Sequence, residues 1–328
     1  MAQVKQVEAY EQTSRQILRV MDHVSTVIVG KAREIELCFV ALLAKGHVLL
    51  EDVPGVGKTR LVKSIAQSLD CQFKRIQFTP DLLPSDVTGI SIYNQHTLEF
   101  EYREGPIFSQ IVLVDEINRT SPRTQAALLE SLEERAVTFD GVTRLLPVPF
   151  IVLATQNPIE YEGTFPLPEA QLDRFLLKIS LGYPSKDEEY QILERSLVGT
   201  FDQELEPVAT QNDILAWQAL AARVFVDQGL LRYAVDLVAR TRTHESVYLG
   251  VSPRGAIGLL HAAQALATLR GRDYLLPDDL KEVAPYVLPH RMILKSDARL
   301  RQVTEATVIA EILASQPVPV HGASFSAR

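Results

Sequence analysis

A ten-residue stretch, EDVPGVGKTR at 51–60, constrains the possible folds of this chain more than any other. It follows a short apolar run, HVLLE, and leads into KTRLVKSIAQSLD, whose pattern predicts a helix beginning at Lys58. A phosphate cradle needs exposed backbone N–H groups, glycines that allow close approach, and a helix N-terminus with a cation and a hydroxyl beside it. Gly55, Gly57, Lys58 and Thr59 supply these groups between a strand and a helix, which is the context that the motif requires.

We therefore predict a nucleotide-phosphate site formed by this loop: Pro54, Gly55, Val56, Gly57, Lys58, Thr59 and Arg60. One position departs from the general pattern, which begins with glycine and here has Asp52. The alternative is a glycine turn that joins a strand to a helix and carries a lysine by chance. The apolar strand before the loop and the helix after it favour the nucleotide site.

A second signal is the acidic pair that ends the apolar run IVLVDE at 111–116. In parallel sheets, ligands gather at the carboxyl ends of the strands. Asp115 and the Thr59 hydroxyl are expected to hold Mg²⁺, partly through water, because Mg²⁺ needs few protein ligands beside phosphate oxygens. Glu116 is expected to orient and deprotonate the attacking water. Without the lysine loop, the same run could be a strand followed by a helix cap.

A third apolar strand, PFIVLATQNP, ends in Gln156 and Asn157. The Asn157 amide could hold the attacking water or sense the γ-phosphate. Taken alone this signal is weak, because Asn-Pro is also a common turn dipeptide. It gains weight from its position at the end of a strand expected beside the other two.

Strand and helix signals alternate over the first half of the chain, which predicts an α/β fold with a parallel sheet. Two hairpins are expected, one across Asn94 to Thr97 and one at the Asp140-Gly141 turn, whereas TPDLLPSDVTG reads as a loop. From Pro184 onward the strand signal stops. Helices are predicted near 186–198, 211–226, 230–246, 253–271, 277–289 and 297–314, before a loose tail.

Composition limits the classes of partner. There are 33 Lys and Arg against 41 Asp and Glu, a net charge of −8, which disfavours a protein that coats nucleic acid. The seven histidines show no paired spacing that is typical of a metal site. No basic segment followed by an apolar one opens the chain, and the longest apolar stretch, 38–50, is too short to span a bilayer. A cytoplasmic location without a membrane span is expected.

With these motifs placed, the sequence closely resembles the MoxR family of AAA+ ATPases over nearly its whole length. The resemblance is carried by EDVPGVGKT, IQFTPDLLPSDVTG, GPIF, LVDEINRTSPRTQAALLESLEERAVT, ATQNP, GTFPLPEAQLDRF, the Tyr183-Pro184 pair and SPRGA at 252–256. It implies a three-layer αβα core over 1–184, an all-α lid over 185–314 and a flexible tail over 315–328. It also implies a helix-2 insert hairpin near 90–103 and a pre-sensor hairpin near 136–146.

The resemblance further assigns arginines. Arg174 in EAQLDRF resembles the finger that reaches into a neighbouring subunit's nucleotide, and Arg254 in VSPRGA resembles the lid residue that touches the γ-phosphate of the same chain. A guanidinium beside the transferring phosphoryl group stabilises its spread negative charge. Both arginines could instead form surface salt bridges, and Arg119, Arg123 and Arg135 are alternative contacts across subunits.

Adenine is expected to pack near Val29 and Gly30 and against the lid, although a Val-Gly pair also suits an ordinary helix entry. A finger that acts across subunits implies a homo-oligomeric ring, a hexamer by resemblance. The function implied is chaperone-like remodelling of client proteins by ATP hydrolysis, with a von Willebrand factor A domain protein as partner. Two alternatives remain open: the motor subunit of a metal chelatase, and a nucleic-acid-remodelling ATPase.

Overall fold

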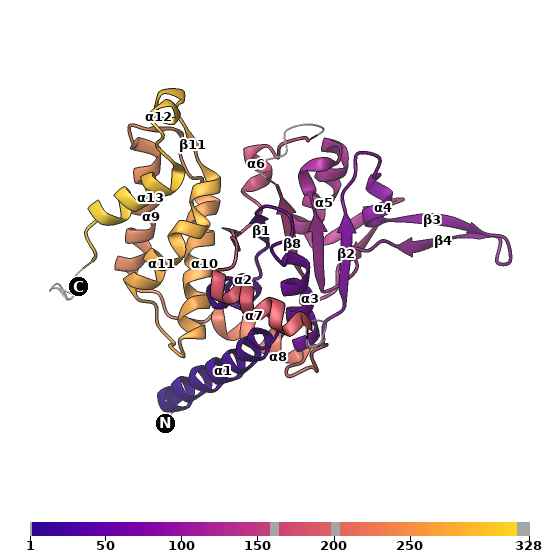
Figure 1. Ribbon diagram of the computed structural model, residues 1–328, viewed down its shortest axis with the longest axis horizontal. Coiled ribbons are helices and arrows are strands. Elements are labelled where there is room, and N and C mark those ends of the chain that lie inside the picture. Colours follow the sequence, from indigo (N-terminus) through magenta and orange to yellow (C-terminus); the bar gives the residue numbers. More distant parts are fainter. Residues whose placement is uncertain (1, 158–163, 198–203, 320–328) are drawn as a thin grey trace, which may run out of the picture.

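The computed structural model, which describes residues 2–157, 164–197 and 204–319, is built on a five-stranded parallel sheet (Figure 1). The strand order is β2-β5-β8-β1-β9. All five strands lie where the sequence predicts them: β1 (Val48–Glu51), β2 (Phe73–Gln77), β5 (Ile111–Asp115), β8 (Ile151–Gln156) and β9 (Leu177–Ile179). Because every pairing is parallel, all five carboxyl ends meet at one edge of the sheet.

Helices cover both faces of this sheet, so the core has three layers. Val48 and Leu50 of β1 belong to one hydrophobic cluster, which also holds α2 (Ala32–Leu43) and α3 (Lys58–Ser68). Leu49, which points to the other face, belongs to a second cluster with α5 (Pro122–Glu134). A strand buried on both faces reads as a continuous apolar run, as HVLLE does.

Two hairpins and a short helix are added to the core. The β3 (Gly89–Asn94) and β4 (Glu99–Glu104) strands pair antiparallel and project far from the sheet (Figure 1). The second hairpin, β6 (Ala136–Phe139) and β7 (Val142–Leu145), turns at Asp140 and Gly141, whose φ angles of 50° and 74° suit a two-residue turn. The expected loop at 79–89 contains a helix instead, α4 (Pro84–Thr88), which Asp86 caps by accepting from the Leu83 N–H.

The second half is mostly helical, but two expectations about it are wrong. Two short strands, β10 (Val247–Leu249) and β11 (Ile293–Leu294), pair antiparallel after Pro184. The helix expected over 297–314 is two helices, because Gln302 takes a left-handed φ of 61° and Thr304 then caps the next helix. The helices are α7 (Lys186–Leu197), α8 (Gln211–Ala221), α9 (Gln228–Thr243), α10 (Pro253–Leu269), α11 (Pro277–Val287), α12 (Ser296–Leu300) and α13 (Glu305–Ser315).

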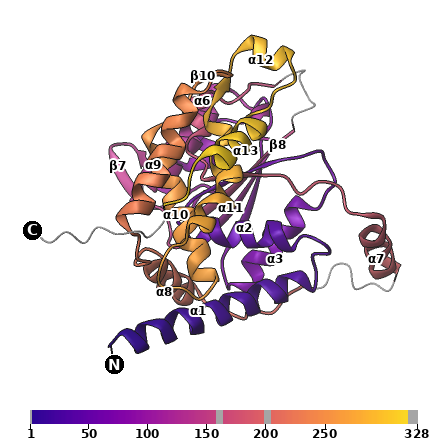
Figure 2. The same cartoon turned by 90° about the vertical axis from the view of Figure 1, so that its left-hand side faces the viewer.

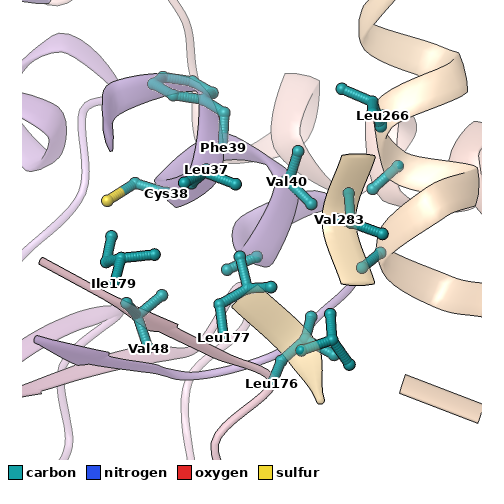
Figure 3. Packing of buried hydrophobic residues seen from close by; sticks show 14 of the residues in the cluster. Leu37, Cys38, Phe39, Val40, Val48, Leu176, Leu177, Ile179, Leu266 and Val283 are labelled. Atoms are coloured by element: carbon teal, nitrogen blue, oxygen red, sulfur yellow. The ribbon is translucent and has the colours of Figure 1, made fainter. Parts of the chain in front are cut away.

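The helices of the second half divide into two groups. Figure 3 shows α2 between the sheet and the helices α10 and α11: its apolar side chains lie beside Leu177 of β9, and Leu266 and Val283 come from the far side. The long first helix, α1 (Ala2–Ser25), also packs on α10. In contrast, α7 stands well apart from α9–α13 (Figure 2).

Residues 320–328 of the predicted tail lie outside the described residues. Within the described part of the chain, no helix is both long and apolar enough to cross a membrane.

Candidate active site

The loop between β1 and α3 presents its backbone to open space. Gly55 and Gly57 take left-handed φ angles of 86° and 91°, which glycine adopts without strain. No atom lies within 4 Å of where a Cβ would stand at either position, so an anion can approach the loop. Gly57 is also the N-cap of α3 and makes no side-chain cap. The first N–H groups of α3 therefore lack a capping side chain and suit a phosphate.

Lys58 spans this loop. Its ammonium donates to the carbonyl oxygens of Asp52 (3.0 Å) and Val53 (3.1 Å). Burial lowers the pKa of Lys58, and the nearby carboxylates of Asp52, Asp115 and Glu116 oppose this shift. The cation is therefore held between the loop and the acidic pair.

Asp52, the departure from the general glycine, has a structural explanation. Its buried carboxylate accepts from the Ser180 hydroxyl (2.9 Å) and from the backbone N–H groups of Leu181 and Gly182, the latter at 3.1 Å. These residues follow β9, so Asp52 ties the phosphate loop to the chain that leads into α7.

The acidic pair lies at the carboxyl end of β5, beside that of β8, as predicted. The Thr155 hydroxyl of β8 donates to Asp115 Oδ1 (3.2 Å) and accepts from the Glu116 N–H (2.9 Å), which fixes the two acids relative to β8. Glu116 itself has a left-handed φ of 58° at the sharp exit from β5. Such strained backbone is common where a side chain must be held for function.

Two side chains of β2 that sequence reasoning missed also contact the acids. Arg75 Nε donates to Asp115 Oδ2 (2.6 Å), and Gln77 Nε2 donates to Glu116 Oε2 (2.7 Å). Arg119 forms a further ion pair with Glu116 (3.2 Å). The signal that could have revealed Arg75 and Gln77 is their spacing: they are alternate residues at the carboxyl end of a strand, so they point to one face.

A hollow of about 520 Å³ joins these groups. Residues from the ends of β1, β2, β5 and β8 line it, including Lys58, Thr59, Asp115, Glu116 and Asn157. The loop residues and the ends of three strands, predicted separately, are therefore together at one edge of the sheet. Within the described residues no group of three or more His, Cys, Asp or Glu could hold a metal ion. The oxygen donors present, Thr59 and Asp115, fit Mg²⁺ in a site that phosphate oxygens complete.

A smaller apolar hollow of about 130 Å³ adjoins the loop. Val29 lines it, as expected for an adenine site, together with Val27, Ile28, Gly55, Val56, Pro184 and Ile192 of α7. Gly30 does not line it; its φ is 71°, and the Glu188 side chain fills the place where a Cβ would stand. The expected lid contact comes from α7, since none of the described residues of α8–α13 lines either hollow.

Arg174 and Arg254 lie elsewhere, and they lie together. Arg174 Nη2 is 3.1 Å from Glu133 Oε2, and Arg254 Nη2 is 2.8 Å from Glu133 Oε1. Both line a hollow of about 260 Å³ that shares no lining residue with the phosphate-loop hollow. Both arginines therefore form a salt bridge, which was the alternative predicted for each of them. The two salt bridges share one carboxylate, that of Glu133.

This position does not fit the expected contact of Arg254 with the phosphate of its own chain. The hollow also contains Gly46 and His47, which precede β1, whereas the phosphate loop follows β1. The four residues of β1 separate the two places by about 13 Å. The physical reason is the position of α10, which packs on α2 rather than over the loop and carries Arg254 to the amino edge of the sheet.

The alternative arginines are also separated. Arg135 donates to the Lys45 carbonyl (2.6 Å) and lines the same hollow as Arg174. Arg119 lies at the acidic pair, and Arg123 lines a groove beside the β6–β7 hairpin. Arg135 is thus the alternative that lies closest in the fold to the arginine pair.

The comparisons with known proteins agree with this architecture. Residues 47–177 match the family described as "ATPase family associated with various cellular activities (AAA)", and residues 239–312 match the AAA lid domain. The chain is 44% identical to Chaperone MoxR1 of Mycobacterium tuberculosis over 92% of this chain and 82% of that protein. It is 33% identical to MoxR of Paracoccus denitrificans, over 89% and 93%.

A solved structure gives the same result for the fold. A crystal structure of a putative ATPase from Cytophaga hutchinsonii superposes with a TM-score of 0.90 at 40% identity and covers 97% of this chain and 98% of that one. The fold and the sequence therefore agree with that structure over nearly the whole chain. The chain belongs to the MoxR family of AAA+ ATPases.

Proposed function

We propose that this protein hydrolyses ATP to ADP and phosphate at the hollow formed by the phosphate loop and the acidic pair. The Lys58 cation and the N–H groups of α3 bind the phosphates, and Glu116 takes the proton of the attacking water. Asn157 orients that water or senses the γ-phosphate. Thr59 and Asp115 would hold Mg²⁺, which neutralises phosphate charge when bound. The observation that supports this most is the convergence of Lys58, Asp115 and Glu116 on one hollow.

We also propose that the site is completed by a neighbouring subunit. Arg174 and Arg254 are both held on Glu133 at the edge of the sheet opposite the phosphate loop. A surface that carries two guanidinium groups away from the protein's own nucleotide is suited to meet the nucleotide of the next copy. Repeated around a circle, this head-to-tail contact closes into a ring, for which we propose six subunits.

The work performed is proposed to be chaperone-like remodelling of client proteins. One relative is named a chaperone, and the β3–β4 hairpin offers a suitable contact surface. Its tip exposes large apolar side chains, with Leu98 70% and Phe100 74% exposed. A partner with a von Willebrand factor A domain, as the family resemblance implies, belongs to this proposal.

The test uses two variants that fail for different reasons. Glu116→Gln should bind ATP and lose hydrolysis, and Arg174→Ala should retain an intact loop but lack the finger. Mixed assemblies of the two should recover activity, because an Arg174→Ala subunit can receive Arg174 from a Glu116→Gln neighbour. If Arg174→Ala alone is as active as the wild type, or if the mixture stays inactive, the shared site is wrong.

A further inference from the structure

Both proposed trans arginines are connected to the lid through one ion pair, between the buried Arg291 and the partly buried Asp173. We propose that Arg291 and Asp173 are positioning residues: they fix Arg174 and Arg254 relative to each other and to the lid, so that one subunit presents both guanidiniums to its neighbour's nucleotide. This inference rests on the proposed function, because it assumes that the arginine pair acts on another subunit.

Asp173 stands at the centre of this connection. It immediately precedes Arg174 in the chain, and its Oδ1 accepts from Arg291 Nε at 2.7 Å. Its other oxygen, Oδ2, accepts from the Ser252 hydroxyl at 2.9 Å. Ser252 is the N-cap residue of α10, two residues before Arg254. A single carboxylate thus joins the turn that carries Arg174 to the helix start that carries Arg254.

The Arg291 side chain also binds backbone carbonyl groups of the turn that carries Arg174. Its side chain is buried, only 3% exposed, and Nη2 donates to the carbonyl oxygens of Phe175 (2.6 Å) and Asp173 (3.3 Å). Nη1 donates to the Leu176 carbonyl at 3.1 Å. Four bonds, counting that to the carboxylate, therefore run from one planar guanidinium to residues 173–176. Lysine has no such fork and could not satisfy these acceptors together.

Two glycines of α10 lie in tight packing beside Arg291. A Cβ at Gly255 would lie 2.2 Å from Val251 Cγ1 and 3.0 Å from Cδ of Arg291, and a Cβ at Gly258 would lie 3.2 Å from Leu176. Both glycines lie inside α10 and neither has a positive φ angle. Glycine is therefore needed at these positions for close packing and not for an unusual backbone conformation. The glycines keep α10 close to Arg291 and to the turn before β9.

An ion pair with a buried partner is weak evidence of a gain in stability, because the cost of burying the Arg291 charge offsets its attraction to Asp173. Such pairs can instead specify one geometry among several. Here the geometry concerns groups that must meet a transferring phosphoryl group, where a displacement of about 1 Å can cost about 10²-fold in rate. A shift of the Arg291–Asp173 ion pair would therefore move Arg174 and Arg254 and lower the rate of phosphoryl transfer.

The first test separates turnover from binding. Arg291→Lys and Asp173→Asn should each lower kcat for ATP hydrolysis about 10- to 100-fold. KM for ATP, and the affinity for a fluorescent ATP analogue, should change less than about twofold, because the phosphate-loop hollow contains neither residue. Wild-type kcat in a folded, assembled Arg291→Lys protein would overturn the proposal.

The second test identifies which side of the shared site fails. Mixed assemblies of Arg291→Lys with Glu116→Gln should recover hydrolysis, because the first supplies an intact loop and the second an intact arginine pair. Assemblies of Arg291→Lys with Arg174→Ala should not recover, because both subunits lack a working pair. The reverse pattern would place the defect in the protein's own nucleotide site and would overturn the proposal.

Matched controls exclude a loss of folding as the cause. Arg272 and Asp279 form another ion pair of the lid with one buried partner, here Asp279, and with two bonds of 2.9 and 2.6 Å, away from the arginine pair. Arg272→Lys should lower the melting temperature as Arg291→Lys does, yet leave kcat within about twofold. Ser252→Ala removes one bond to Asp173 without a buried charge and should lower kcat in the same sense. If Arg174→Ala is fully active, the proposed function fails; if only the Arg291 and Asp173 variants are normal, this inference alone fails.

Discussion

Asp52 shows how one residue can depart from a motif and take a structural role. The glycine of the general pattern is replaced by a buried carboxylate with three donors from residues 180–182. Those donors would lack partners without it, and an unsatisfied buried donor costs more than a hydrogen bond gains. Asp52 in place of glycine is therefore explained by its link to residues 180–182.

A prediction follows at this position. Asp52→Gly, which restores the general motif, should lower the free energy of unfolding by about 2–4 kcal/mol, because the Ser180 hydroxyl and two N–H groups lose their acceptor. Asp52→Asn, which keeps one acceptor oxygen, should lose less. Urea unfolding measures both, and an unchanged midpoint for Asp52→Gly would show that the link contributes nothing.

His47 gives a prediction about pH. It is buried between β8 and the end of α5: its Nδ1 accepts from the Val152 N–H (3.0 Å) and its Nε2 lies 3.3 Å from the Leu132 carbonyl. Burial lowers its pKa from 6.5 to about 4. Between these values the unfolded chain binds more protons, so this stabilisation is complete above pH 6.5 and is lost as the pH falls towards 4.

From about pH 7.5 to about pH 4.5, His47 should therefore account for a loss of about 2.5 kcal/mol in the free energy of unfolding. The loss should be smaller by this amount in His47→Gln, measured by denaturant unfolding at both pH values. His96→Gln, at an exposed position, is the control and should follow the wild type. Parallel pH profiles for His47→Gln and wild type would contradict the assignment.

Among the elements, the β3–β4 hairpin separates a packed base from a free tip. At the base, the Tyr102 ring lies 5.6 Å from Phe139 and 6.1 Å from Phe108, and Arg144 stacks on it at 3.9 Å. At the tip, Leu98 and Phe100 are exposed and make no contribution to the hydrophobic clusters. Arg144 and Phe139 belong to β7 and β6, so the base of the β3–β4 hairpin packs against the second hairpin.

Replacing residues 92–101 by a two-residue Asn-Gly turn should therefore change the free energy of unfolding by less than about 1 kcal/mol. Tyr102→Ala, at the base, should cost about 2 kcal/mol or more, because a half-buried ring loses its contacts. Chemical unfolding of the two proteins checks both values. A large loss from the shortened hairpin would mean that its tip packs on the protein.

At the scale of the whole molecule, the position of the lid bears directly on the proposed hydrolysis of ATP. The helices α10 and α11 pack on α2 and β9, so the lid carries Arg254 to the edge of the sheet opposite the phosphate loop. Hydrolysis should then depend on assembly. The specific activity of the wild type should rise with protein concentration.

Arg174→Ala should bind ATP, yet hydrolyse it about 10³-fold or more slowly at every concentration. Arg301→Ala, whose exposed side chain pairs with Asp297 of α12, is the control and should behave as the wild type. A wild-type activity that is independent of concentration, with a normal Arg174→Ala, would indicate that a single subunit is sufficient.

Local signals in the sequence determined much of this protein. Glycine positions, apolar runs that end in acids, and turn residues predicted the phosphate loop, the five strands and both hairpins, because each depends on a few neighbouring residues. The sequence motifs also indicated the family. Asp115, Glu116 and Asn157 could be grouped in advance because parallel strands place their carboxyl ends at one edge.

Only the tertiary structure decided where the lid lies and what it carries. The contacts of Arg254, Arg75, Gln77 and Asp52 join residues that are 39 to 130 positions apart or depend on which helix packs on which face. A pattern of a few neighbouring residues cannot predict contacts between residues so far apart in the sequence. The same holds for the contacts of Arg291, which form because α10 and α11 pack near residues 173–176. Packing of apolar faces, which is non-directional and shared by many residues, determines that arrangement.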